Sequence, residues 1–173
     1  MSGRKKQRIY WDSCAFIAIF SNESDKVDIC SSIFRDAQVG KIELFTSTLA
    51  IVECTGGAAE LSKMTENAFA ERQRLIRSFF RHRCLHFVQM DRRLMEEAAS
   101  LAQWRRRNGG TIPNTDAIHL ASALHAQADV LQTYDTRHLL ALHDTPLPGY
   151  PNSLKIQPPS NIWNVSLGGE FSS

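Results

Sequence analysis

The chain has 173 residues, 43% of them hydrophobic, which suits one domain with a buried core. Its formal net charge is only +2, which excludes a polycation that binds nucleic acid or membranes along its whole length. No apolar run approaches the ~18 residues that a membrane span needs. The basic start leads into an apolar segment, as in a signal peptide, but Asp12 interrupts that segment and no clear cleavage site follows. We therefore expect a cytoplasmic protein.

The first half of the chain alternates between β-prone runs and helical patterns. Ser13 is a suitable N-cap for a helix after the first strand, and Gly40 is placed to end the second helix. The helix that carries Glu53 stops at the Gly56-Gly57 pair. In chain order the patterns predict a strand at 8–11, helices at 14–20 and 25–39, a strand at 42–46, a helix from Ser47 or Thr48, and a long helix at 62–81.

The second half continues the same alternation. Asp91 is a suitable N-cap, and the Asn108-Gly109-Gly110 run breaks the helix that follows it. Asn114 or Thr115 caps the next helix, so Asp116 falls in its first turn. In chain order the patterns predict a strand at 84–90, a helix at 92–107, a helix from 114 or 115, a strand at 129–134, a short helix to about 142, and a last strand at 153–157.

Strands that alternate with helices predict an α/β fold, a three-layer α/β/α sandwich with a mainly parallel central sheet. We expect the domain to span residues 1–158. Residues 159–173 are polar and contain glycine, which predicts a flexible C-terminal tail. The sequence has no P-loop and no G-x-G-x-x-G, which argues against a nucleotide-binding Rossmann protein.

Four acidic residues stand at the positions where such a fold concentrates its chemistry. Asp12 and Asp135 each follow a β-prone run, and Glu53 and Asp116 lie in helical patterns. A parallel sheet brings the carboxyl ends of its strands to one edge, where four carboxylates would repel one another without a cation. Hard oxygen ligands suit Mg²⁺ or Mn²⁺, so the four acids predict a metal site and metal-assisted chemistry on a phosphodiester.

Each acid also has an ordinary structural explanation. Asp12 can cap the helix that follows it, and Asp116 is favoured in a first helical turn by the helix dipole. Asp135 can be a turn residue. Glu53 lies within a helix, where glutamate is common on the solvent side, although its neighbours are apolar or small.

Further residues could support this site. Ser13 could bind the metal through its backbone or a water, and Thr133 could hydrogen-bond a ligand carboxylate. Arg105, Arg106 and Arg107 precede the loop that leads to Asp116, and they are candidate contacts to the phosphates of RNA. The alternative for these arginines is a solvated helix face.

The cysteines and histidines do not form a recognisable zinc motif. Neither C-x-x-C nor H-E-x-x-H occurs, so we interpret the cysteines as reduced thiols in or near the core and expect no disulfide or zinc role. His119 and His125 lie six apart on a predicted helix, and we interpret both as structural or surface residues. The cysteines are Cys14, Cys30, Cys54 and Cys84.

The motifs around the acids resemble those of a PIN domain. They are YWDSCAFIAIF, the S-T-L-x-x-x-E segment, the D-A-I-H-L-A-S-A-L helix and the T-Y-D strand end, and the resemblance runs from about Ile9 to about Ile156. Within that family the chain is most similar to the VapC-like ribonuclease toxins of bacterial toxin–antitoxin systems. The segment from Asp116 to Asp135 is the most specific part.

The resemblance implies a metal-dependent endoribonuclease that acts on RNA, with Asp12, Glu53, Asp116 and Asp135 as its metal-binding catalytic residues. It also implies a small antitoxin protein as partner and a homodimer. The apolar helices at 14–39 and 47–57 are candidate surfaces for the antitoxin.

Three alternatives remain open from the sequence. The first is a PIN nuclease of RNA processing or decay that has no antitoxin. The second is a non-catalytic binding module, although retention of all four acids argues against it. The third is an aspartyl-phosphate phosphatase, which needs D-x-D where this chain has Asp12-Ser13-Cys14.

Overall fold

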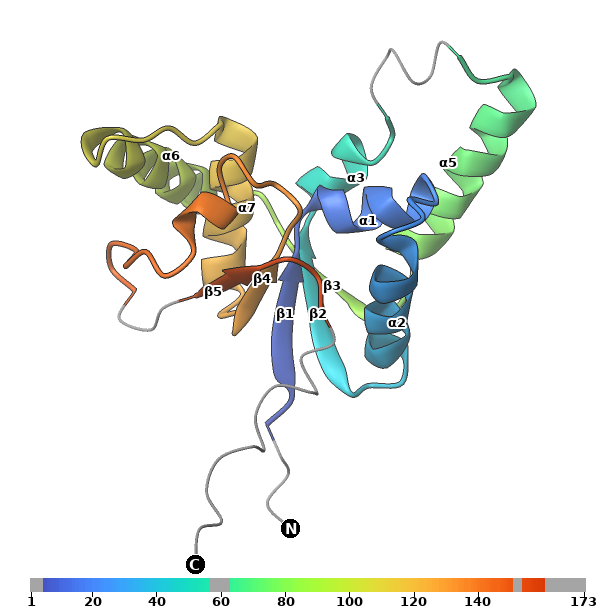
Figure 1. Cartoon of the computed structure of the whole chain (residues 1–173), viewed down its shortest axis with the longest axis horizontal. Coiled ribbons are helices and arrows are strands. Elements are labelled where there is room, and N and C mark those ends of the chain that lie inside the picture. The colour runs from blue at the N-terminus through green and yellow to red at the C-terminus, as the bar shows by residue number, and fades with distance from the viewer. Residues whose placement is uncertain (1–4, 57–62, 151–153, 161–173) are drawn as a thin grey trace, which may run out of the picture.

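The computed structural model describes residues 5–56, 63–150 and 154–160. Within these residues the strands form one parallel sheet in the order β3-β2-β1-β4-β5 (Figure 1). The strands are β1 (Gln7–Trp11), β2 (Ile42–Ser47), β3 (Leu85–Val88), β4 (Val130–Gln132) and β5 (Lys155–Gln157).

Helices connect the strands and cover the sheet. They are α1 (Ser13–Phe20), α2 (Val27–Gln38), α3 (Leu49–Glu53), α5 (Glu66–Phe80), α6 (Arg92–Arg107), α7 (Asn114–His125) and the 3₁₀ helix η1 (Leu140–Leu142). Helices α6 and α7 lie on one side of the sheet, and α1, α2 and α5 lie on the other (Figure 1). The predicted α/β/α sandwich is confirmed, and the sheet is parallel throughout its described strands.

The central strand β1 shows why the sheet needs a layer on each face. Successive side chains of a strand point to opposite faces. Tyr10 joins the core formed with α6 and α7, whereas Ile9 and Trp11 join the core formed with α1, α2 and α5. All three side chains are almost fully buried. Aromatic packing adds to the second core, where Phe16 lies 5.1 Å from the Trp11 ring, centroid to centroid.

The strand order places a topological switch point beside β1. From β1 the chain builds β2 and β3 outward on one side, and then crosses to build β4 and β5 on the other. In open parallel sheets the crevice at the carboxyl end of such a switch point is the usual ligand site. Here it lies between the ends of β1 and β4, which deliver Asp12 and Asp135.

The predicted elements are confirmed, with shifts at their ends. Several helices begin later than predicted: α2 starts at Val27, α3 at Leu49 and α5 at Glu66, where the Thr65 side chain accepts a hydrogen bond from the Ala68 N–H. The short helix predicted after Asp135 is mostly turn, with only η1 as regular structure. The first residue of the helix predicted at 62–81 lies outside the described residues.

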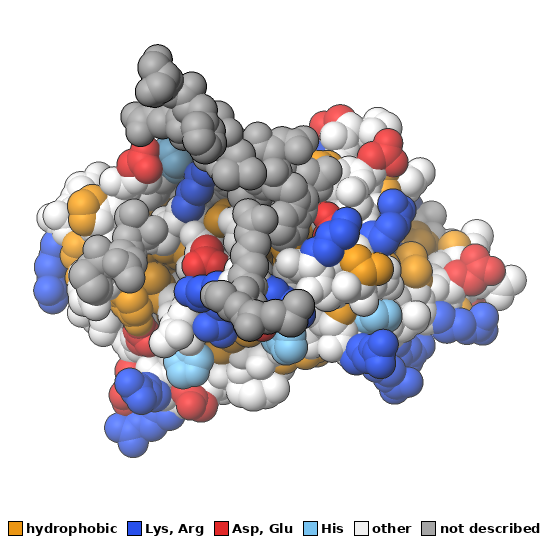
Figure 2. Space-filling model, turned by 90° about the horizontal axis from the view of Figure 1, so that it is seen from below, with side chains coloured by type: hydrophobic (Ala, Val, Ile, Leu, Met, Phe, Trp, Pro, Cys, Tyr) orange, Lys and Arg blue, Asp and Glu red, His pale blue; other side chains and the backbone are white. Residues whose placement is uncertain are grey.

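Strand β5 ends at Gln157, next to the predicted domain boundary at 158. Most of the predicted tail, residues 161–173, lies outside the described residues, so the boundary and the tail stay predictions. None of the helices in the described part of the chain is both long and apolar enough to cross a bilayer. Figure 2 shows the face at the amino ends of the strands, where acidic and basic side chains are mixed.

Candidate metal centre

Asp12 lies at the carboxyl end of β1 and caps α1. Its Oδ1 accepts a hydrogen bond from the Cys14 N–H at 3.1 Å, and its Oδ2 accepts one from the Thr133 hydroxyl at 2.5 Å. The side chain is 3% exposed. Burial raises the pKa of the Asp12 carboxyl, against the lowering effects of His119 and Thr133. The capping role predicted as the structural alternative is therefore present, and it fixes the carboxylate at the switch point.

Thr133 joins the ends of the two central strands. Besides donating to Asp12, its Oγ1 accepts the Asp135 backbone N–H at 2.9 Å. The side chain is fully buried. The predicted role of Thr133 as a hydrogen-bond partner of a candidate ligand is consistent with this geometry, which reaches the Asp12 carboxylate directly and Asp135 through its backbone.

Replacing Thr133 by valine should remove both bonds without changing the side-chain shape. We expect the Thr133→Val protein to lose about 1–3 kcal/mol of unfolding free energy, because a buried carboxylate loses its donor. Thr133→Ser keeps the hydroxyl and should recover most of that loss. Urea unfolding of the three proteins measures the effect, and equal stability of the valine and wild-type proteins would contradict it.

Asp116 and Asp135 approach each other around a histidine. His138 Nδ1 lies 3.1 Å from Asp116 Oδ2 and 3.2 Å from Asp135 Oδ2. The ligand atoms of these three residues all lie within 4.8 Å of one another, an arrangement that could hold a metal ion. Asp116 comes from the first turn of α7, and Asp135 and His138 come from the turn after β4.

The two aspartates have different electrostatic environments. Burial raises the pKa of Asp116 to about 6, the charge of Asp135 adds to this, and His138 opposes it. Burial also tends to raise the pKa of Asp135, but the backbone N–H groups of Leu139 and Arg137, together with His138, lower it overall. Asp135 therefore stays a carboxylate, and its negative charge makes ionisation of Asp116 less favourable.

Glu53 is the last residue of α3 and reaches the same end of the sheet. Its Oε2 lies 2.7 Å from Nε2 of His119, a residue of α7 that is 2% exposed. Burial tends to raise the pKa of Glu53, but hydrogen bonds from His119 and Ser13 and the charge of His119 lower it overall. Ser13, predicted as a metal contact, thus lies against Glu53 and supports this carboxylate.

The four predicted acids therefore gather at one end of the sheet, although not equally closely. Asp116 and Asp135 form the close cluster, and Asp12 is tied to it through Thr133. Asp12 also contributes to the raised pKa of Asp116, which places the two carboxyls within electrostatic reach. Glu53 joins through His119, which also lowers the pKa of Asp12.

Two histidines of this site were not predicted. His119 was interpreted as structural or surface, and the surface interpretation is wrong because the ring is buried against Glu53. His138 was not considered. A signal existed for His138, which follows Asp135 by three residues, a spacing that places the two side chains on one side of a tight turn.

The residues present fit a hard divalent cation. The donors are carboxylate oxygens, the type that Mg²⁺ and Mn²⁺ prefer. Burial, together with the Asp135 charge, raises the pKa of Asp116, so its ionised form is unfavourable even with the His138 ring beside both carboxylates. A cation held by Asp12, Glu53, Asp116 and Asp135 would compensate this negative charge.

The arginine group lies beside the loop that leads to Asp116. The Arg105 side chain lies directly over Gly110, so close that a Cβ at residue 110 would collide with the guanidinium. Arg106 and Arg107 are exposed at the end of α6. Arg106 also lines a cavity of about 250 Å³ with Thr111 and Asn114. The loop glycine thus lets Arg105 stay near the start of α7.

Comparison with known proteins agrees with this fold. The family model of the PIN domain matches residues 9–142, and the chain belongs to the PIN-domain family. No curated protein matches the sequence.

Solved structures share the fold at low sequence identity. A DNA-bound VapBC from Salmonella typhimurium has a TM-score of 0.62 at 14% identity, with 88% of this chain and 98% of that chain covered. Mycobacterium tuberculosis VapC20, described as a toxin that cleaves the sarcin–ricin loop, has a TM-score of 0.56 at 14% identity, with 81% and 99% covered. A toxin–antitoxin complex from Klebsiella pneumoniae has a TM-score of 0.55 at 17% identity, with 89% and 99% covered.

Proposed function

We propose that this protein is a Mg²⁺- or Mn²⁺-dependent endoribonuclease, the toxin of a toxin–antitoxin pair acting in the cytoplasm. The observation that carries the proposal is the cluster at the switch point, where ligand atoms of Asp116, Asp135 and His138 lie within 4.8 Å of one another. Membership of the PIN-domain family supports it, and so do the descriptions of VapC20 and of the other toxin complexes.

Each acid has a defined part in the proposed site. Asp12 and Asp135 are held by hydrogen-bond donors, so they offer oxygens in fixed positions. Asp116 and Glu53 complete the ligand set from α7 and α3. The chemistry that a bound cation supplies is a lowered pKa for water and an offset for charge on the phosphate. A carboxylate of the centre accepts the proton of the attacking water.

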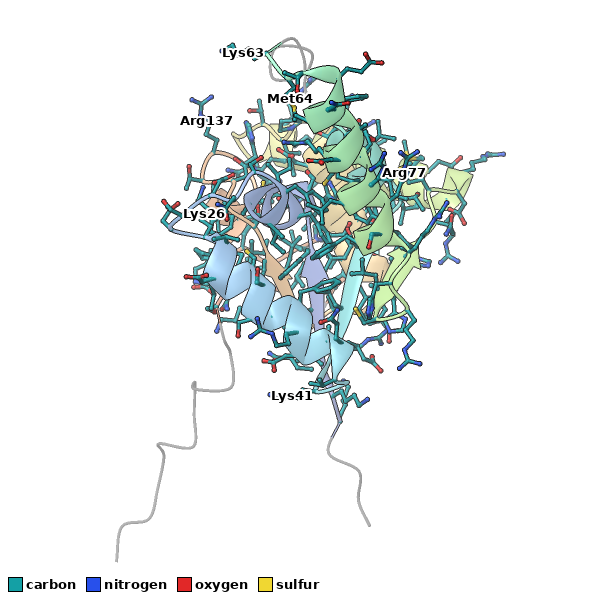
Figure 3. All side chains as sticks on the ribbon, turned by 90° about the vertical axis from the view of Figure 1, so that its right-hand side faces the viewer. Lys26, Lys41, Lys63, Met64, Arg77 and Arg137 are labelled. Atoms are coloured by element: carbon teal, nitrogen blue, oxygen red, sulfur yellow. The ribbon has the colours of Figure 1, made fainter. Side chains whose placement is uncertain are left out.

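Basic residues beside the centre can bind the RNA backbone. Arg106 and Arg107 are exposed at the end of α6, and Arg105 lies over the loop before Asp116. Arg137, whose backbone N–H donates to Asp135, has an exposed side chain that extends outward near the carboxyl ends of the strands, while Lys41 lies at the opposite end (Figure 3). These cations would contact phosphates on either side of the scissile bond.

An apolar surface on α3 suits the proposed antitoxin. Val52 is 67% exposed and Ile51 is 39% exposed, whereas most apolar side chains of α1 are buried. The Gln73 side-chain amide of α5 donates a hydrogen bond to the Thr55 carbonyl, just after α3. Phe69 of α5 is also exposed. Of the two predicted docking segments, 47–57 therefore presents exposed apolar side chains on α3, and 14–39 presents Val39. The proposed homodimer stays a prediction, which a measurement of the molecular mass in solution can test.

The test of the proposal is cleavage of a mixed RNA panel by the purified full-length chain with Mg²⁺, with Mn²⁺ and with EDTA. Cleavage should require the metal and should be lost in Asp12→Asn. Asp144→Asn is a matched control, because Asp144 is 85% exposed and contacts His143 instead of a residue of the candidate centre. A mass spectrum of the same sample detects a co-purified inhibitor. Absence of cleavage in an inhibitor-free sample would overturn the proposal.

A further inference from the structure

Helix α7 turns a second polar side chain toward the site, one turn after Asp116. The His119 ring is 2% exposed, and both of its nitrogens have a partner. Nδ1 lies 2.9 Å from the Tyr10 hydroxyl of β1, and Nε2 lies 2.7 Å from Glu53 Oε2 of α3. The His119 imidazole therefore connects Tyr10 of the central strand with Glu53 of α3, a candidate metal ligand.

His119 lies on a helix whose buried side chains are mostly apolar. Its neighbours on α7, Ala117, Leu120 and Leu124, pack in the core of this side of the sheet. Burying a polar group there is unfavourable unless all its hydrogen-bonding atoms are satisfied. Leucine would suit packing alone. The site instead uses a ring with two nitrogens, each within hydrogen-bond distance of one defined partner.

The geometry also defines the role of Nε2. A carboxylate oxygen can only accept, so Nε2 of His119 donates to Glu53 Oε2. The Tyr10 hydroxyl, which can donate or accept, is the partner of Nδ1. Tyr10 in the central strand thus holds the ring with Nε2 directed at Glu53.

Glu53 depends on side-chain partners for its orientation. It ends a helix of only five residues, and its carboxylate is three rotatable bonds from the backbone. Asp135 is held by three backbone N–H groups, and Asp12 by the Cys14 N–H and thiol and the Thr133 hydroxyl. For Glu53, the contacts are the Ser13 side chain and the buried imidazole.

We propose that Tyr10 and His119 are positioning residues that hold Glu53 in the orientation required to bind the cation. The inference rests on the proposed metal-dependent function. One carboxylate oxygen is fixed by His119, and the remaining acceptor capacity of the group is directed to the metal. Partners of this kind orient ligands in many metal sites, and their loss weakens metal affinity by about 10- to 100-fold.

Two substitutions of His119 separate positioning from packing. The amide nitrogen of glutamine reaches about as far as Nε2, so His119→Gln keeps the donor to Glu53. The amide of asparagine reaches only about as far as Nδ1, so His119→Asn keeps a contact with Tyr10 and loses Glu53. Both delete the ring, and a packing role alone predicts similar behaviour from the two.

The measurement is Mn²⁺ titration of the full-length chain, followed by the electron paramagnetic resonance of free Mn²⁺, with thermal unfolding in EDTA alongside. His119→Asn should bind Mn²⁺ about 10- to 100-fold more weakly than wild type, and His119→Gln should recover most of the affinity. Tyr10→Phe, which keeps the ring packing, should show a smaller loss. His125→Asn, on the exposed end of the same helix, should bind as wild type.

Controls distinguish failure of this inference from failure of the proposed function. If wild type binds no Mn²⁺, the metal-dependent function itself fails. If wild type binds and Glu53→Gln binds weakly, but His119→Asn binds normally, the positioning role is overturned. Equal losses in His119→Asn and His119→Gln would overturn it as well, because the donor to Glu53 would then not matter.

Discussion

Asp116→Asn should reduce RNA cleavage by more than about 100-fold while the protein stays folded. Loss of a group that only supports a metal ligand already lowers metal affinity or activity by about 10- to 100-fold, and Asp116 is proposed as a ligand itself. Asparagine keeps the size of the side chain but removes the charge that the cation requires. A cleavage assay in Mg²⁺ with matched protein concentrations measures the effect.

Folding of the Asp116→Asn protein should be unimpaired in EDTA at neutral pH. The carboxyl has a pKa of about 6 because of burial and the nearby Asp135 charge, so its ionised form is unfavourable in the metal-free fold. Removing that charge should add about 1–2 kcal/mol to the unfolding free energy, after allowance for partial exposure. Asp144→Asn should match wild type in both assays. Wild-type cleavage by Asp116→Asn would refute the assignment of this residue.

Saturating Mn²⁺ should raise the melting temperature of the wild-type protein by about 5–10 °C at pH 7.5. A ligand at 100 times its dissociation constant stabilises the native state by about 2.7 kcal/mol, and each kcal/mol shifts a domain of this size by about 2–4 °C. The shift should be nearly absent in Asp116→Asn. An equal shift in both proteins, measured by scanning fluorimetry, would place the bound ion elsewhere.

The Mn²⁺ shift should shrink as the pH falls through about 6, because protonated Asp116 is no longer a ligand. Without metal the pH effect has the opposite sign. The folded-state pKa of Asp116 lies above the ordinary value of 3.8, so this group lowers stability as the pH rises from about 4 to about 6. In EDTA, the unfolding free energy of wild type should therefore rise relative to that of Asp116→Asn as the solution is acidified. A pH series of unfolding curves measures this difference.

Local sequence patterns predicted most of the fold, because the period of apolar residues and the capping side chains act within a few residues. The Asp91 cap and the breaks at glycines are of this kind. The predicted ends of helices were less accurate, as at α2 and α5, because the last turns depend on which side chain satisfies the terminal N–H groups. The approach of Asp12 and Asp135 was predictable because topology alone brings strand ends together, whereas Glu53 and Asp116 come from helices α3 and α7.

The role of His119 could not be predicted, since its partners lie 66 and 109 residues away along the chain. A histidine on an apolar helix face looks the same whether its neighbours are hydrophobic or carry a tyrosine and a glutamate. Thr133 was easier, because its position two residues before Asp135 keeps it at the same strand end. Only the packed structure shows that Thr133 binds Asp12, which is 121 residues away.

The division of the centre between distant parts of the chain has a consequence for synthesis. Asp12 and Glu53 are made early, whereas Asp116, Thr133 and Asp135 come from the last third of the sequence. They meet only when β4 pairs with β1, with Ile9 beside Val130. A nascent chain on the ribosome therefore holds only half of the candidate metal site until β4 has emerged. The proposed nuclease would be inactive toward the RNA around it until β4 has paired with β1.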